Sequence, residues 1–259
     1  MVNCLSDKKF ENLLFVNVCI QNVETIALFD TGAGMTVIAR TLLEKLGFAA
    51  EDNVLYAGNN NGLVRTLQTT VISNVRLGDI CIEKLRVVVT DDADFALCDK
   101  SGADFPAEML LGWDVISRYR WSYSAKNNTL SVSTSKRATA FSNPDLKRGP
   151  IVFPEYLGYR FKARVDTGHT GSTLSAAWHT RFLNVEWHET EQVGIGSAQH
   201  ISSPYIRDFP ILFQDRFIHL RDVDIREKIY GQPPDIEALL GYDFLEGIDW
   251  KLDQEFRLQ

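Results

Sequence analysis

The chain carries two copies of one sequence pattern, and this repetition constrains its fold more than any other feature. Asp-Thr-Gly occurs at residues 30–32 and again at residues 166–168, each time at the end of an apolar, strand-like run. The two aspartates lie 136 residues apart (166 − 30), slightly more than half of the 259 residues. A repeat of this length predicts two structural units of the same kind.

The surroundings of the two triplets repeat in the same order. Each triplet is followed by a short helical pattern, at residues 40–46 and 175–183, and a glycine returns 28 residues beyond each aspartate (58 − 30; 194 − 166). Residues 108–114, Glu-Met-Leu-Leu-Gly-Trp-Asp, are echoed by Glu-Ala-Leu-Leu-Gly-Tyr-Asp at residues 237–243. The order of these echoes indicates a tandem duplication.

The sequence between the two copies has the composition of a connector. Residues 135–150 are polar and basic and contain Pro144, Gly149 and Pro150. We therefore predict an N-terminal lobe at residues 1–134, a linker at residues 135–150 and a C-terminal lobe at residues 151–259.

These residues resemble those of the retropepsin-like aspartic proteases. In that family an apolar strand ends in Asp-Thr-Gly, and a Leu-Leu-Gly segment followed by an aromatic residue comes later in the chain. The resemblance extends from about residue 12 to the end of the chain. It implies an all-β, bilobal aspartic-protease fold: two retropepsin-like β-barrel lobes with pseudo-twofold symmetry, and a short helix after each Asp-Thr-Gly and each Leu-Leu-Gly.

The chemistry of paired carboxyl groups gives the two aspartates a function. Peptide hydrolysis without a metal or a covalent nucleophile needs a base to activate water and an acid to polarise the carbonyl group. Two carboxyl groups about 3 Å apart cannot both ionise, so they share one proton. The ionised carboxylate is then the base, and the protonated carboxyl group is the acid. We expect Asp30 and Asp166 to be this catalytic dyad, and we expect the roles to belong to the pair.

Other residues of the triplets are expected to support the dyad. Gly32 and Gly168 suit a tight turn that brings backbone close to the carboxylates. By resemblance to the family, the hydroxyl groups of Thr31 and Thr167 form hydrogen bonds across the lobe interface beneath the dyad, and both Leu-Leu-Gly segments pack behind the catalytic loops.

His169 departs from the family pattern. The first copy has Ala33 at this position, and the family usually has Ala, Ser or Thr there. A cationic histidine beside the dyad would favour ionised carboxylates and so tune or block activity. The alternative is that His169 points away and bonds to a backbone carbonyl group.

Two glycine-rich segments are candidate flaps that cover a bound peptide. Gly and Asn tolerate the positive φ angles of a hairpin tip. The candidate flap residues are Gly58, Asn59, Asn60, Asn61 and Gly62 in the first lobe and Gly194, Ile195, Gly196 and Ser197 in the second. Ordinary surface turns remain the alternative for each segment.

Composition and charge limit the kinds of partner and the location that we expect for this protein. A net charge of −7 argues against a nucleic-acid partner, and no segment approaches the roughly 20 apolar residues of a membrane span. The first residues lack the apolar core of a signal peptide, so the expected location is the cytoplasm. The histidines all lie in the second half at spacings that match no metal motif, and we expect no metal and no cofactor. The acidic stretch at residues 91–94 is interpreted as a solvated insertion.

Together these observations predict an aspartic endopeptidase that acts on protein or peptide substrates. Because both aspartates are on one chain, a monomer is expected to be active. The alternative function is a pseudo-protease that binds extended peptide segments in the groove between the lobes without cleaving them. A self-processing precursor is a third hypothesis, disfavoured by the short segment ahead of residue 12.

Overall fold

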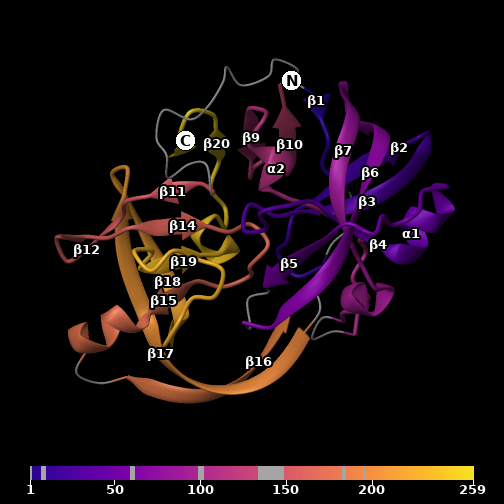
Figure 1. Cartoon of the computed structure of the whole chain (residues 1–259). Coiled ribbons are helices and arrows are strands. Elements are labelled where there is room, and N and C mark those ends of the chain that lie inside the picture. The colour runs from indigo at the N-terminus through magenta and orange to yellow at the C-terminus, as the bar shows by residue number, and fades with distance from the viewer. Residues whose placement is uncertain are drawn as a thin grey trace.

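The computed structural model describes residues 2–6, 10–58, 62–98, 102–133, 149–182, 185–194 and 197–259. Within these ranges most regular structure is β-strand, and the helices are short. The strands form three sheets: one in each half of the chain, and one to which both halves contribute (Figure 1). The prediction of an all-β, bilobal fold is confirmed.

The N-terminal lobe contains, in chain order, β1 (Val2–Asn3), β2 (Phe15–Ile20), β3 (Val23–Phe29), β4 (Val37–Ala39), α1 (Arg40–Lys45), β5 (Val54–Gly58), β6 (Val64–Leu77), β7 (Ile80–Thr90), the 3-10 helix η1 (Asp92–Phe95), β8 (Met109–Leu111), α2 (Trp113–Ile116), β9 (Trp121–Ser124) and β10 (Thr129–Val132). Its own sheet has the order β2-β3-β8-β4-β7-β6-β5. A further pairing of β2 with β6 curls this sheet into a barrel-like shape.

The C-terminal lobe contains, in chain order, β11 (Ile151–Val152), β12 (Glu155–Tyr156), β13 (Tyr159–Arg160), β14 (Ala163–Val165), β15 (Thr173–Ser175), the 3-10 helix η3 (Ala176–Arg181), β16 (Glu186–Gly194), β17 (Ser197–Phe213), β18 (Arg216–Arg226), β19 (Ala238–Leu240), the 3-10 helix η4 (Tyr242–Phe244), β20 (Trp250–Leu252) and β21 (Phe256–Leu258). Its sheet has the order β11-β14-β19-β15-β18-β17-β12-β13, and β16 pairs with β17.

The two lobes repeat the same pairings around their triplets. In the first lobe β3 runs parallel to β8, and β4 lies between β8 and β7. In the second lobe β14 runs parallel to β19, and β15 lies between β19 and β18. The short helices expected after each Asp-Thr-Gly and each Leu-Leu-Gly are present, as α1 and α2 in the first lobe and as 3-10 turns in the second.

The third sheet joins the lobes through the backbone. Its order is β1-β10-β9-β20-β21, so strands of the N-terminal half pair directly with strands of the C-terminal half. The junction is antiparallel, with Trp250 opposite Tyr123 and Leu252 opposite Trp121. Because backbone hydrogen bonds cross from one half to the other, this sheet fixes how the two lobes face each other.

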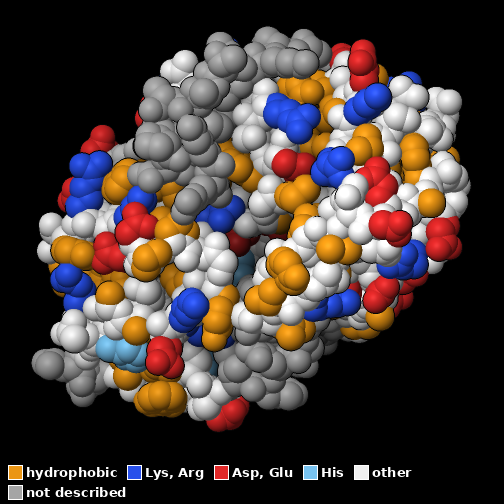
Figure 2. All heavy atoms as spheres, in the orientation of Figure 1, with side chains coloured by type: hydrophobic (Ala, Val, Ile, Leu, Met, Phe, Trp, Pro, Cys, Tyr) orange, Lys and Arg blue, Asp and Glu red, His pale blue; other side chains and the backbone are white. Residues whose placement is uncertain are grey.

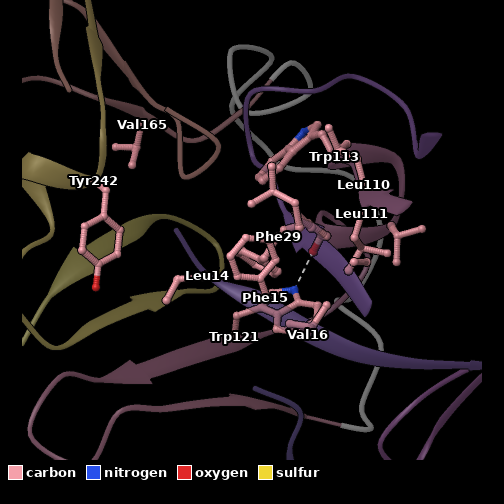
Figure 3. Packing of buried hydrophobic residues seen from close by; sticks show 14 of the residues in the cluster. Leu14, Phe15, Val16, Phe29, Leu110, Leu111, Trp113, Trp121, Val165 and Tyr242 are labelled. Atoms are coloured by element: carbon pink, nitrogen blue, oxygen red, sulfur yellow. Dashed lines mark hydrogen bonds between the residues drawn. The ribbon is translucent and has the colours of Figure 1, made fainter. Parts of the chain in front are cut away.

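Aromatic packing lies directly behind the first triplet. The ring of Phe29, the residue before Asp30, packs edge-on against Trp121 at 4.8 Å between centroids and lies 6.3 Å from Trp250. The indole nitrogen of Trp121 donates a hydrogen bond to the carbonyl oxygen of Ile116 at 2.8 Å (Figure 3). These residues belong to one apolar core cluster that includes residues of both halves, so the triplets rest on a continuous packed base.

One interpretation of the sequence is wrong in part. Residues 91–94 were expected to be a solvated insertion, but Asp94 is only 9% exposed. Its carboxylate receives two hydrogen bonds from Arg65 of β6, both at 2.8 Å, and one from the hydroxyl group of Thr90. Asp92 accepts a hydrogen bond from the backbone N–H of Thr41 at 3.0 Å, in the first turn of α1. The acidic stretch therefore anchors neighbouring elements instead of facing only solvent.

Two further expectations concern parts of the chain that the structure covers incompletely. Of the predicted linker, residues 135–150, only Gly149 and Pro150 lie among the described residues, so the predicted lobe boundaries stay predictions. In the described ranges, no helix has the length and apolar character needed to cross a membrane.

Candidate active site

Parallel strand pairs place the two aspartates at equivalent positions. The backbone N–H of Asp30, just after β3, donates to the carbonyl oxygen of Leu111 in β8 at 3.1 Å. The backbone N–H of Asp166, just after β14, donates to the carbonyl oxygen of Leu240 in β19 at 2.8 Å. Each aspartate is therefore fixed to the strand of its own Leu-Leu-Gly segment.

The structure brings the two aspartates together. A β-carbon added to Gly32 would overlap with the carboxylate of Asp166, and one added to Gly168 would overlap with the carboxylate of Asp30. Each glycine thus lies against the carboxylate of the opposite lobe, at a distance that no side chain would allow. Both aspartates keep part of their surface exposed.

The two threonines interlock across the lobe interface. The hydroxyl oxygen of Thr31 accepts the backbone N–H of Thr167 at 3.1 Å, and the hydroxyl oxygen of Thr167 accepts the backbone N–H of Thr31 at 3.1 Å. Each hydroxyl group also donates across the interface, Thr31 to the carbonyl oxygen of Val165 at 2.8 Å and Thr167 to that of Phe29 at 2.6 Å. Both threonines are buried, so each lobe supplies the other with hydrogen bonds that water does not replace.

Burial and the neighbouring carboxylate control the charge of Asp30. One carboxylate oxygen of Asp30 accepts backbone N–H groups from Gly32 at 2.7 Å and Ala33 at 2.9 Å, which favour its ionised form. Desolvation, the most important cause, and the charge of Asp166 outweigh these bonds and raise the pKa of Asp30 to about 8. The pair therefore holds a proton at neutral pH.

A hydroxyl–carboxylate pair supports the first loop from behind. The hydroxyl group of Thr36 donates to Asp114 at 2.8 Å and accepts the backbone N–H of Gly112 at 3.2 Å. A β-carbon on Gly112 would overlap with the backbone of Met35, which explains the glycine of the Leu-Leu-Gly segment. Burial raises the pKa of Asp114 although Thr36 bonds to it.

The second lobe repeats this support with a different hydroxyl residue. The hydroxyl group of Ser172 donates to Asp243 at 2.7 Å and accepts the backbone N–H of Gly241 at 3.1 Å. Burial raises the pKa of Asp243 in the same way. The resemblance implied that the Leu-Leu-Gly segments pack behind the catalytic loops, but these hydroxyl–carboxylate pairs were not predicted. Their signal in the sequence is the aspartate that ends both echoes, Asp114 and Asp243.

His169 is held by its own loop. Its ring nitrogen Nδ1 lies 2.5 Å from the carbonyl oxygen of Gly171, and its backbone carbonyl accepts the N–H of Tyr242 at 2.7 Å. The corresponding carbonyl in the first lobe is that of Ala33, which accepts the N–H of Trp113 at 2.8 Å. The backbone role of this position is thus the same in both lobes, and the ring contacts a backbone carbonyl, the second of the two alternatives left open by the sequence.

Arg164 is a charged residue at the site that was not predicted from the sequence. Residues 159–165 alternate between apolar and polar side chains, which is the pattern of a half-buried strand and favours an exposed Arg164, but Arg164 is only 5% exposed. Its guanidinium Nη2 donates to the carbonyl oxygens of Thr31 at 2.7 Å and Gly32 at 2.9 Å in the opposite lobe, and Nη1 donates to Gln232 at 3.1 Å. The signal was its position, two residues before Asp166, where the first copy has Leu28.

The candidate flaps lie at the ends of two hairpins of unequal length. Gly58 ends β5, Gly62 precedes β6, and Gly194 at the end of β16 pairs with Ser197 at the start of β17. Asn59, Asn60, Asn61, Ile195 and Gly196 lie outside the described residues. The hairpin of β16 and β17 is the longer one and arches away from the body of its lobe (Figure 1).

The first hairpin is apolar and touches the opposite lobe. Four of its large apolar side chains are exposed: Val54, Tyr56, Leu63 and Val64. Gly62, with φ of 79°, lies so close to the ring of Tyr230 in the C-terminal lobe that an added β-carbon would overlap with the ring. Figure 2 shows this face of the molecule hollowed between the two lobes.

Among the described residues, no group of histidine, cysteine, aspartate and glutamate side chains has the arrangement of a metal site.

Comparisons with known proteins find sequences similar to part of this chain. The aspartyl protease family model matches residues 16–115. Protein DDI1 homolog 2 of Danio rerio is 29% identical over 130 residues, which are 50% of this chain and 29% of that protein. Protein DDI1 homolog 1 of Homo sapiens is 30% identical over 130 residues, which are 50% of this chain and 30% of that protein. The chain therefore spans less than a third of the length of these curated relatives.

A solved structure, that of a retropepsin-like aspartic protease from Rickettsia conorii, aligns with a TM-score of 0.34 and 17% identity, covering 51% of this chain and 88% of that chain. The family model covers the first triplet and the first Leu-Leu-Gly segment. Asp166 stands in the same arrangement of strand, triplet and Leu-Leu-Gly segment as Asp30. The first half of the chain is therefore similar to aspartyl proteases in sequence, and the second half repeats its arrangement of strands, triplet and Leu-Leu-Gly segment.

Proposed function

We propose that the protein is an aspartic endopeptidase that hydrolyses peptide bonds with a water molecule activated between Asp30 and Asp166. The observation that carries this proposal is the mutual arrangement of the two triplets. Each glycine lies against the opposite carboxylate, and Thr31 and Thr167 bond reciprocally across the interface. A binding groove alone would not require two carboxylates to be held against each other at the cost of burial.

The proposed reaction uses one proton shared by the dyad. The ionised carboxylate removes a proton from water while the water oxygen bonds to the peptide carbonyl carbon. The protonated carboxyl group gives its proton to the carbonyl oxygen. The dyad then gives its proton to the leaving nitrogen, one hydroxyl group of the tetrahedral diol returns a proton to the dyad, and the C–N bond breaks to yield a carboxylic acid and an amine. The dyad ends with the same single proton with which it began.

The pKa of Asp30 sets the alkaline limit of this proposed activity. Its folded pKa of about 8 lies far above the ordinary value for aspartate, so the shared proton stays bound below about pH 8 and is lost as the pH rises through that value. Activity should fall above about pH 8, because the dyad then has no acid. At low pH activity should fall because both carboxyl groups are protonated and the dyad has no base.

The proposed substrate is an extended segment of a peptide or protein lying between the two hairpins. Exposed apolar side chains on the first hairpin, such as Tyr56 and Val64, support contact with apolar substrate residues. We further propose that a monomer is active, because one chain supplies both aspartates. The cytoplasmic location stays a prediction from the sequence.

The test compares cleavage of a diverse peptide pool by the wild-type protein, D30N and D166N, from about pH 4 to about pH 9. Asp79→Asn, in the exposed turn between β6 and β7, is the matched control for the loss of one carboxylate. We expect D30N and D166N to lose at least about 100-fold in rate and D79N to match the wild type. Equal cleavage by all four proteins, or none by any, would refute the proposal.

The same samples test the alternative of a pseudo-protease. If wild-type protein retains peptides from the pool on a sizing column but leaves them intact at every pH, binding without chemistry is the better description.

A further inference from the structure

One buried cation crosses the interface beneath the dyad. Arg164 comes from β14 of the C-terminal lobe, yet its Nη2 donates to two consecutive carbonyl oxygens of the N-terminal lobe, those of Thr31 at 2.7 Å and Gly32 at 2.9 Å. These carbonyls belong to the turn that carries Asp30. A single guanidinium nitrogen therefore holds the turn of one aspartate from the lobe of the other.

The contact has no counterpart on the other side of the pseudo-twofold axis. The residue two positions before Asp30 is Leu28, which is buried and has no side-chain donor. Arg164 is enclosed further by Gly149, where a β-carbon would overlap with its guanidinium group. Among the described residues, the buried Nε of Arg164 has no hydrogen-bond partner. An arginine that is kept buried with one donor unsatisfied costs stability, so its presence calls for a compensating role.

Electrostatics supplies that role. Burial lowers the pKa of Arg164, while the charges of Asp166 and then Asp30 raise it, so the cation and the two carboxylates act on each other. An arginine side chain remains protonated in proteins. A dyad that shares one proton carries one negative charge, and one guanidinium balances it in a site that water reaches poorly.

We propose that Arg164 is a positioning residue of the dyad, which fixes the Asp30 turn from the opposite lobe and supplies the buried positive charge that balances the ionised carboxylate. Its part in catalysis rests on the proposed function. Its effect on the proton affinity of the dyad does not, because that effect exists with or without turnover.

Few titratable groups near Arg164 could change the titration of the dyad. Among the described residues, the charges acting on it are those of Asp166 and Asp30. Its other contacts are neutral: the carbonyl groups of Thr31 and Gly32, the amide of Gln232 and the backbone of Gly149. His169, on the Asp166 turn, is the titratable neighbour whose contribution must be separated, and its Nδ1 is engaged by a carbonyl oxygen of its own loop.

The experiment measures the titration of the dyad directly. Protein labelled with carbon-13 at the aspartate carboxyl groups is titrated by NMR as wild type, R164M, R164Q and R164K, and the D30N and D166N spectra assign the dyad signals. We expect the dyad of R164M and R164Q to release its proton at a pH about 1 unit or more above that of the wild type, because the balancing cation is gone. R164K keeps the charge and should titrate within about half a unit of the wild type.

Activity provides the second measurement. R164K should lower kcat about tenfold or more with little change in KM, since lysine is a point charge and cannot reproduce the fixed guanidinium geometry that holds the Asp30 turn. Arg160→Met, at an exposed position of β13 in the same lobe, removes one positive charge from the surface and should match the wild type in both measurements.

Two results would overturn the proposal: a dyad in R164M and R164Q that titrates as in the wild type, or a shift in R164K as large as in R164M. A purely structural role of Arg164 would lower stability in all three variants without moving the titration. If R164M and R164Q do not fold, the kcat of R164K decides the question. A wild-type kcat in R164K would contradict a positioning role of Arg164. Absence of cleavage by the wild-type protein would refute the proposed function and leave the titration result standing.

Discussion

Asp30 and Asp166 are held by the same backbone framework but by different numbers of bonds. Among the described residues, the carboxylate of Asp30 accepts backbone N–H groups from Gly32 and Ala33, whereas that of Asp166 accepts one backbone N–H, from Gly168 at 3.0 Å. The next N–H of the second turn, that of His169, donates to the backbone carbonyl of Asp166 at 3.2 Å instead. Two loops with nearly the same sequence thus give their carboxylates different surroundings.

The lobes differ more as the distance from the triplets increases. Leu28 corresponds to Arg164, and the first strand of the flap hairpin has 5 residues in the N-terminal lobe and 9 in the C-terminal lobe. A homodimer must use one surface twice, so both halves of its site are identical. A fused chain is free of this requirement, and here the backbone contacts around the dyad are duplicated while the side chains beyond them have diverged.

The largest effect is expected from substitutions of the two triplet glycines, which test whether the backbone contacts around the dyad are equivalent in both lobes. In G32A and in G168A the new methyl group would overlap with the carboxylate of the opposite lobe. A displacement of about 1 Å at a reacting group costs on the order of 100-fold in rate, so both variants should lose at least that much in kcat. Steady-state kinetics on a peptide cleaved by the wild type measures it.

The chain offers a matched control in each lobe. A β-carbon added to Gly34 or to Gly171 meets no atom within 4 Å, so G34A and G171A should keep wild-type kcat. If G32A were inactive and G168A active, the approach of backbone to carboxylate would be essential on one side alone, and the symmetric account of the dyad would be wrong.

An intermediate effect is expected at the interlocked threonines. In T31V and in T167V a buried backbone N–H of the opposite lobe loses its acceptor, which costs about 1–3 kcal/mol in the free energy of unfolding. The two losses should be similar, and the double variant should lose less than their sum because the residues belong to one network. Urea unfolding measures all three variants.

Serine substitutions separate the hydroxyl group from packing. T31S and T167S keep the donor and acceptor and should stay within about 1 kcal/mol of the wild type. A large loss in T31S, or strict additivity in the double valine variant, would mean that the reciprocal hydrogen bonds do not couple the lobes.

The backbone part of this site follows from the sequence, for a physical reason. Each Asp-Thr-Gly triplet lies at the end of an apolar strand and is followed later by a Leu-Leu-Gly segment. This pattern specifies where the strand ends, where two backbone segments pass close to each other and which aspartate lies at the strand end. The fold class, the strand ends before Asp30 and Asp166, and the short helices were predictable because neighbouring residues determine them.

Contacts between distant segments were not predictable in the same way. The alternation of apolar and polar residues before Asp166 indicated that Arg164 lies on the polar face of its strand. Whether another lobe covers that face depends on residues far away in the sequence, such as Thr31, which is 133 positions from Arg164. Asp94 in the acidic stretch is similar, because its partner Arg65 comes from another strand. Burial of a charge is a property of the assembled fold, and composition alone favours solvent for both residues.

The smallest expected effect concerns His169, the most visible difference between the two triplets in the sequence. H169A gives the second loop the residue found at Ala33, and His179→Ala, exposed on η3, is the control for loss of a histidine. Because the His169 ring contacts the carbonyl oxygen of Gly171, its removal should cost about 0.5–1.5 kcal/mol in the free energy of unfolding and leave the pH profile of kcat unchanged. A pH profile that moves in H169A but not in H179A would show that the ring acts on the dyad.

The H169A and R164M results together locate the functional difference between the two lobes. If the pH profile of H169A is unchanged and the dyad titration of R164M is shifted, the difference lies in the buried arginine of β14, two residues before the second triplet. The histidine that follows the triplet would then have no part in it.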